Sequence, residues 1–254
     1  MTAITPAERI LLDLGITDPK EIDLDAIAWD QGAVVNYRPL DRCEATIVGS
    51  SRRAVITVNS RSSPERQRFS VGHELGHWHH HRGRVLFCGK KEVENPADDV
   101  LNPERHADDF ASDMVLPNYL LRPRLMKLKR VTLAEARELA EEFKASVTAT
   151  LIKIAAANRF PIIVVCHNKQ KRRWFRRSEI VPGWWFPQGR LDPDSFAADM
   201  LFNGAPEQAR PRKIGADAWF DFRKCDRFDV EEQSFMLPGE EVLTLLRIPD
   251  EGLS

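Results

Sequence analysis

The chain has 254 residues, of which 43% are hydrophobic and 30% charged, as is typical of a globular protein with one large or two smaller domains. Its 37 Lys and Arg residues nearly balance its 38 Asp and Glu residues, so the chain as a whole has no electrostatic attraction to nucleic acid or to anionic membranes. Any such binding requires a local patch of charge.

Nothing in the sequence indicates export or membrane insertion. The N-terminal segment MTAITPAERILLDLG has no basic stretch followed by an apolar core, and no apolar run approaches the length of about 20 residues that a spanning helix needs. The cysteines form no CxxC pair, which argues against a disulfide framework and against a cysteine-rich zinc site. We therefore expect a cytoplasmic protein that does not bind membranes.

The first sixty residues contain two predicted helices and then three predicted strands. Apolar residues at helical spacing predict helices over residues 5–15 and 22–31. The strand signals are β-branched runs separated by turn-forming residues, and we expect an antiparallel meander. The predicted strands lie at residues 33–37, 45–49 and 54–59.

Three more helical stretches follow. The first covers residues 63–81, where Pro64 suits a first turn. The second covers residues 104–115 and stops before Pro117. Residues 132–157 begin with a capping box. After them, strand-like runs alternate with Pro- and Gly-bearing turns, which predicts a domain boundary near residue 158. The runs are IIVVC, RWFRR, AWFDF and VLTLLRI.

One short motif carries most of the chemical information. His73-Glu74-Leu75-Gly76-His77 is an H-E-x-x-H sequence inside a predicted helix. Helical residues four apart are offset by about 40 degrees, so both imidazoles point the same way and can share one tetrahedral zinc ion. Glu74 lies beside them, where it can act as a general base toward a water that the metal activates. The alternative is a surface helix that carries two histidines by chance.

A catalytic zinc also needs a third protein ligand and an open position for water. Glu104 is the candidate, because Asp108 follows on the same helical face and can accept a hydrogen bond from a ligand histidine. His106 is the main alternative, and it lies about 200 degrees around the helix from Glu104, so only one of them can face the ion. His81, one turn beyond His77, either lines the site or hydrogen-bonds the chain.

These segments resemble the ImmA/IrrE metallopeptidases of bacteria and mobile elements. The resemblance rests on AVITVNSRSSPERQRFSVGHELGHWHHH and on ERHADDFASDMVLP, and it extends over roughly residues 7–157. It implies a catalytic acid/base at Glu74, and Asp108 falls where the family has Asp or Asn. The metal is expected to be zinc, with manganese as the alternative. The implied metal ligands are His73, His77 and Glu104.

The resemblance also implies a function. Known members have a thermolysin-like active site and cleave helix-turn-helix repressors, which relieves transcriptional repression after stress. We therefore expect a zinc-dependent endopeptidase of narrow specificity that acts on a helix-turn-helix repressor or an antitoxin-type protein. An extended substrate is expected to add as a strand beside residues 54–59. The alternative is a DNA- or partner-binding transcriptional regulator that uses the zincin fold as a scaffold, and DNA binding stays open.

The expected fold class is α+β with three parts. Residues 1–130 form a zincin-like core of a short antiparallel sheet and metal-binding helices, and residues 131–158 form a helix-turn-helix-like segment. Residues 159–254 form a smaller mixed α/β or mostly β domain for sensing or substrate recognition. The helix-turn-helix-like segment offers only Lys153 and Arg159 as cations near its second helix, so it departs from a good DNA-binding element.

The run from Lys169 to Arg177 is the one basic patch that contains aromatic residues. Two interpretations are open. A positive stripe beside stacking aromatics can hold nucleic acid. Alternatively, the run is a solvated hairpin in which charges keep a sheet edge soluble.

Overall fold

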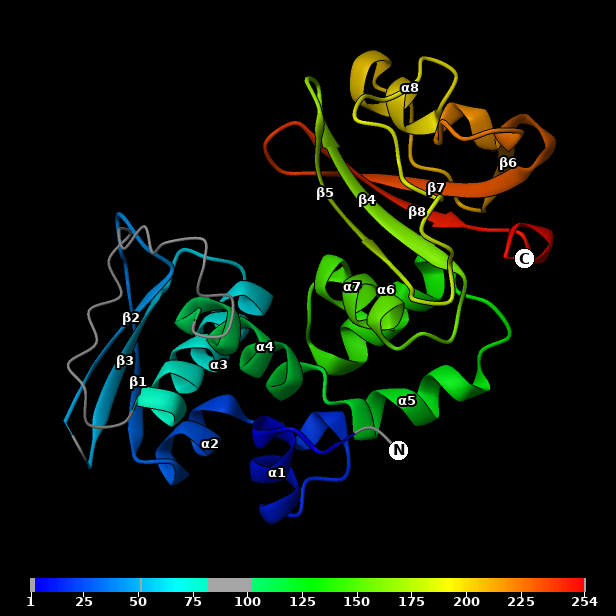
Figure 1. Ribbon diagram of the computed structural model, residues 1–254. Helices are drawn as coiled ribbons and strands as arrows, with labels where there is room; N and C mark the ends of the chain where they lie inside the picture. Colours follow the sequence, from blue (N-terminus) through cyan, green and yellow to red (C-terminus); the bar gives the residue numbers. More distant parts are fainter. Residues whose placement is uncertain (1–2, 51, 82–101, 254) are drawn as a thin grey trace. The chain divides into compact units, whose positions relative to one another are not determined.

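The computed structural model describes residues 3–50, 52–81 and 102–253 (Figure 1). The chain divides into two compact units, and we describe each by itself. No helix in these described ranges is long and apolar enough to cross a membrane. The predicted three-part division stays a prediction. The first unit comprises Met1–Pro123 and Ala140–Ser146, and the second comprises Arg124–Leu139 and Val147–Ser254.

The first unit contains a three-stranded sheet in the order β1-β3-β2 (Figure 1). β1 (Ala33–Arg38) pairs in parallel with β3 (Ala54–Asn59), and β2 (Ala45–Gly49) pairs with β3 in antiparallel fashion. The strand positions are confirmed to within a residue, but the meander prediction is wrong, because β1 lies beside β3. β3 takes the centre because its inward side chains, Ile56 and Val58, are fully buried. Both edges of β3 are therefore occupied.

Five helices accompany this sheet in the described part of the chain up to residue 127, and the last of them, α5, begins in the first unit and ends in the second. Four of them follow the predicted stretches, and α5 was not predicted, because Pro117 and Pro123 argue against a helix there. Glu8, from the first helix, accepts hydrogen bonds from the backbone N–H groups of Asn118 (2.6 Å) and Tyr119 (3.3 Å) and so caps α5 from a distant part of the chain. The helices are α1 (Pro6–Asp13), α2 (Leu24–Asp30), α3 (Pro64–His81), α4 (Pro103–Val115) and α5 (Asn118–Lys127).

α3 and α4 come closest where two glycines of α3 face two alanines of α4. A Cβ atom added at Gly76 would lie 2.8 Å from the Cα of Ala107, and one added at Gly72 would lie 3.1 Å from the Cα of Ala111. Both alanines are fully buried. Because the distance between packed helices depends on the side chains at the contact, these four small residues let the two backbones approach closely.

The second unit contains a five-stranded antiparallel sheet in the order β5-β4-β8-β7-β6 (Figure 1). The inner strands β4 and β8 are buried along nearly their whole length. The α+β prediction is confirmed, and the described C-terminal part is mostly β. The strands are β4 (Ile162–Asn168), β5 (Arg172–Arg177), β6 (Arg212–Gly215), β7 (Asp229–Leu237) and β8 (Glu241–Arg247).

The helical stretch over residues 132–157 forms two helices, α6 (Leu133–Phe143) and α7 (Val147–Ala156). They are separated at Lys144, whose φ of 52° interrupts the right-handed helix. One strand prediction is wrong. AWFDF, residues 218–222, begins at the last residue of a 3-10 turn over residues 216–218, and its Trp219 and Phe220 pack into the core. A further helix, α8 (Phe196–Asn203), was not predicted.

Two titratable side chains lie in the interior of the second unit. Glu232 is fully buried, and this burial raises its pKa although its carboxylate accepts four hydrogen bonds. His167 is also buried, and burial lowers its pKa to about 4. The uncharged form of each residue is therefore favoured. The donors to Glu232 are the backbone N–H groups of Phe196 and Ala197, the indole N–H of Trp219 and the hydroxyl of Ser234.

The helix crossing gives a first prediction. Gly76→Ala introduces a methyl group against the α4 backbone, and we expect it to destabilise the protein by about 1–3 kcal/mol. Gly72→Ala should cost less, since its closest contact is longer. Chemical denaturation followed by circular dichroism measures the effect. Gly189→Ala is the matched control, because nothing lies within 4 Å of its added methyl group, and equal stability of all three variants would contradict the tight crossing.

Candidate metal centre

Three side chains from α3 and α4 converge on one point. His73, His77 and Glu104 each offer a ligand atom, and these atoms all lie within 4.8 Å of one another. The Nε2 atoms of the two histidines are 3.0 Å apart, and each lies 3.3 Å from a carboxylate oxygen of Glu104. The two histidines lie one turn apart on α3, as the sequence predicts. The contact between α3 and α4 brings the carboxylate of Glu104 next to them.

Asp108 fixes the orientation of the first histidine. Its Oδ1 lies 2.9 Å from Nδ1 of His73, on the side of the ring that faces away from Glu104. Burial alone would lower the pKa of His73, but the hydrogen bond with Asp108 and the nearby carboxylates of Glu74, Asp108 and Glu104 together raise it. When Nδ1 donates its proton to Asp108, the lone pair of Nε2 points toward the other two groups.

This donor set fits a divalent transition metal. Bonds of 2.0–2.1 Å in tetrahedral geometry place ligand atoms about 3.3 Å apart, close to the 3.0 and 3.3 Å separations here. Two imidazole nitrogens and a carboxylate are also the ligands of one type of catalytic zinc site. Three electron-pair donors that face one another repel unless a cation or a proton lies between them. The arrangement therefore suits an ion held by three protein ligands.

Local capping explains how Glu104 reaches this point. The side chain of Asn102 accepts hydrogen bonds from the backbone N–H groups of Glu104 (3.1 Å) and Arg105 (3.3 Å), and Pro103 occupies the first turn. Both features favour a helix start at this position. Neither Asn102 nor Gly72 was among the predicted site residues. The Asn-Pro pair and the glycines one turn apart were the signals that could have identified them.

Glu74 lies on the protein-facing side of the cluster. Only 3% of its surface is exposed, and its charge is near enough to raise the pKa of His73. A buried carboxylate next to a cation site is held close to the ligands and away from bulk water. That position suits a proton acceptor, as the motif predicts.

Among the described side chains, the other histidines lie outside the cluster. His106 is exposed, and its ring centroid lies 5.8 Å from that of His80. His79 is also exposed and stacks on Phe110 with a centroid distance of 5.3 Å. His81 is the last residue of α3, and its side chain lies outside the described part of the structure. The geometry therefore favours Glu104 over His106 as the third donor.

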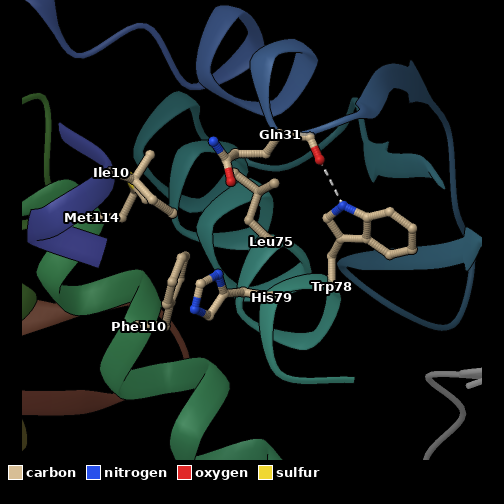
Figure 2. A pocket seen from close by; sticks show the side chains of 7 residues that line it. All are labelled: Ile10, Gln31, Leu75, Trp78, His79, Phe110 and Met114. Carbon is tan, nitrogen blue, oxygen red and sulfur yellow. Dashed lines mark hydrogen bonds between the residues drawn. The ribbon is translucent and has the colours of Figure 1, made fainter. Parts of the chain in front are cut away.

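A small cavity lies on another side of α3 and contains none of the converging side chains (Figure 2). Its volume of about 10 Å³ leaves room for about one water molecule. Nearby, the indole N–H of Trp78 donates a 2.9 Å hydrogen bond to the carbonyl of Gln31, which ties α3 to the end of α2. The cavity is a packing gap of the helical layer. Its lining residues are Ile10, Gln31, Leu75, Trp78, His79, Phe110 and Met114.

A matched pair of variants tests the choice of third ligand. Glu104→Gln removes a charged donor, and we expect zinc affinity to fall by more than about 100-fold, beyond the 10–100-fold that loss of an outer hydrogen-bond partner causes. His106→Gln should leave the affinity unchanged. Competition with a chromogenic chelator measures both. Weaker binding by the His106 variant together with normal binding by the Glu104 variant would contradict the assignment.

Comparisons with known proteins agree with this geometry. The model of the IrrE N-terminal-like domain, peptidase family M78, matches residues 28–155. A Mycobacterium tuberculosis transcriptional regulator of known structure has a similar fold, with a TM-score of 0.60 and 15% identity over 97% of this chain and 87% of that chain. No curated protein matches the sequence. The matched residues span half of the chain and include α3 and α4, and the chain belongs to the family of IrrE N-terminal-like domains, peptidase family M78.

Proposed function

We propose that the chain is a zinc-dependent endopeptidase of narrow specificity. The observation that carries this proposal is the convergence of His73, His77 and Glu104 within 4.8 Å, with Glu74 buried beside them. Membership in a peptidase family supports hydrolysis of a peptide bond. We assign the first three residues as metal ligands and Glu74 as the catalytic base.

The residues of the site have different roles in hydrolysis. When bound, the zinc ion would supply Lewis-acid chemistry that polarises the peptide carbonyl and makes water more acidic. Glu74 accepts a proton from the attacking water and donates it to the leaving nitrogen. Asp108 holds His73 in one tautomer and orientation. These roles place every proton transfer on Glu74.

The sheet suggests where an extended substrate binds. β3 is paired on both sides, so the prediction that a substrate adds beside residues 54–59 is wrong. Among the described strands, β2 ends the sheet next to β3, and its outer edge has no strand partner. Backbone hydrogen bonds to this edge would hold a peptide without selecting its sequence. Narrow specificity then has to come from side-chain contacts elsewhere.

We propose a helix-turn-helix repressor or an antitoxin-type protein as the substrate, so that cleavage relieves transcriptional repression. The support is the resemblance of both metal-binding segments to ImmA/IrrE enzymes, which act on such repressors. The similar transcriptional regulator of known structure supports the fold of this chain. The role in transcription that its name gives belongs to that protein.

The second candidate is a regulator that binds DNA through α6 and α7, which form the expected pair of helices over residues 131–158. The cations in this region argue against that surface. Lys153 is 8% exposed, and the guanidinium of Arg159 bonds to three backbone carbonyls. Burial removes Lys153 from the surface, whereas Arg159 is exposed and its carbonyl partners orient it. α7 has Lys153 as its one cation and buries it, so this helix does not present a basic recognition face.

The catalytic role of Glu74 gives the next prediction. Glu74→Gln should keep zinc at one equivalent and lower the cleavage rate by about 10²–10⁴-fold, since general base catalysis contributes that much. Metal analysis and a cleavage assay measure the two properties. Glu65→Gln, on the same helix, is the control that should cleave normally. A Glu74→Gln protein that is as active as the wild type would refute the role.

The substrate class is tested by co-expression. We expect the wild-type chain to produce one defined cut in a helix-turn-helix repressor encoded beside it and the Glu74→Gln variant to produce none. Mass spectrometry of the fragments locates the cut. If the wild type leaves every neighbouring repressor intact but cleaves another protein, the substrate proposal fails and the peptidase proposal survives.

A further inference from the structure

The basic run of the second unit lies on an edge strand. β5 (Arg172–Arg177) is the first strand of the five-stranded sheet and has only β4 as a strand neighbour (Figure 1). Two cations of the run are neutralised within the same unit. Lys169 Nζ lies 2.6 Å from Glu240, and Arg173 Nε lies 3.3 Å from Glu241. These two ion pairs cancel part of the positive charge of the run.

The other cations of the run keep their charge. Across residues 3–50, 52–81 and 102–253, no carboxylate forms an ion pair with Lys171, Arg176 or Arg177. The guanidinium of Arg176 donates to the carbonyl of Phe175 (3.1 Å), and that of Arg177 donates to the carbonyl of Gly183 (3.0 Å). A carbonyl orients a guanidinium but does not cancel its charge. A positive stripe thus follows the edge of β5, with Arg176 and Arg177 on opposite faces of the strand.

A second segment runs beside this stripe and adds aromatic rings. The backbone N–H of Arg172 donates a 2.7 Å hydrogen bond to the carbonyl of Gly189, so residues 183–189 follow the strand in the opposite direction. Within this segment, Trp185 is fully buried, whereas Trp184 is 52% exposed and Phe186 is 54% exposed. Two large rings therefore lie at the surface next to unpaired cations.

The strand holds one of these rings in a fixed position. The Phe186 ring meets that of Phe175 at a centroid distance of 5.1 Å, and the guanidinium of Arg172 lies 4.5 Å from the centroid of Phe186. Packing on two sides limits the motion of the ring but leaves half of it accessible. A rigid, half-exposed ring loses little entropy when a ligand stacks on it.

We propose that this surface binds single-stranded nucleic acid. We call it the β5 surface and define it as Lys171, Arg176, Arg177, Trp184 and Phe186. The cations contact backbone phosphates, and the two rings stack on bases, which is how proteins hold single strands without reading sequence. The chain is near neutral overall, so the attraction has to come from a local cluster of positive charge such as this stripe.

The two other interpretations explain less of the surface. Cations are sufficient to keep an edge strand soluble, and they give no reason to expose a tryptophan and a phenylalanine beside it. An acidic protein would satisfy the cations, but flat aromatic faces match bases better than carboxylate side chains. A duplex hides its base faces inside the stack, so it would use only the charges.

The test uses the full-length protein and fluorescently labelled oligonucleotides of twenty thymidines or twenty uridines. We expect fluorescence anisotropy to show binding at 50 mM salt, with affinity that falls as salt rises. Trp184→Ala should weaken binding by at least about fivefold, because a stacked base contributes that much. Arg176→Ala should lower the slope of log affinity against log salt by about 0.7, the value for one phosphate on a single strand.

Matched controls come from the first unit. Trp29→Ala removes a tryptophan that is 71% exposed, and Arg53→Ala removes an exposed arginine, and both variants should bind like the wild type. Stronger binding of the thymidine or of the uridine strand identifies the preferred backbone and supports the proposal either way. Four results would overturn it: no binding of either strand, equal loss in the control variants, tighter binding of a duplex of the same length, or tighter binding of polyglutamate.

Discussion

The close crossing of α3 and α4 is the constraint on which the candidate metal centre depends. An H-E-x-x-H helix by itself presents two imidazoles to solvent, and a third donor has to come from elsewhere in the chain. Gly72 and Gly76 leave no side chain between this helix and the two buried alanines of α4. The start of α4 thereby comes within 3.3 Å of both histidines. Larger side chains at these glycines would push the carboxylate out of reach.

Most of the candidate site could be predicted from the sequence because its geometry is local. Two histidines four residues apart must share a helical face, and Glu104 and Asp108 are related by the same spacing on a second helix. The open choice between Glu104 and His106 could not be decided from spacing alone, since it depends on which face of α4 meets α3. The glycine and alanine pairs decide that, and they act through contacts between residues that are about 30 to 40 apart in the chain.

The errors in the fold have nonlocal causes. The order of strands in the first sheet depends on which strand buries more surface. The residues in the turns between the strands do not predict this order. α5 contains Pro123 and is stabilised by Glu8 from the other end of the unit, so local rules predict no helix. Likewise, AWFDF has the composition of a strand, but its aromatic residues fill the core of the second unit. The exposed rings of the β5 surface come from a loop that has no strand or helix pattern.

The buried pair Glu232 and His167 shapes how the second unit responds to acid. Because the folded state holds the Glu232 proton more tightly than the unfolded chain, which releases it near pH 4.5, folding takes up a proton and stability increases as the pH falls toward that value. His167 has the opposite effect, since its pKa drops from 6.5 to about 4 on folding, and stability decreases as the pH falls through that window. The two linkages oppose each other in mild acid. The proton uptake by Glu232 therefore offsets part of the stability that His167 loses as the pH falls.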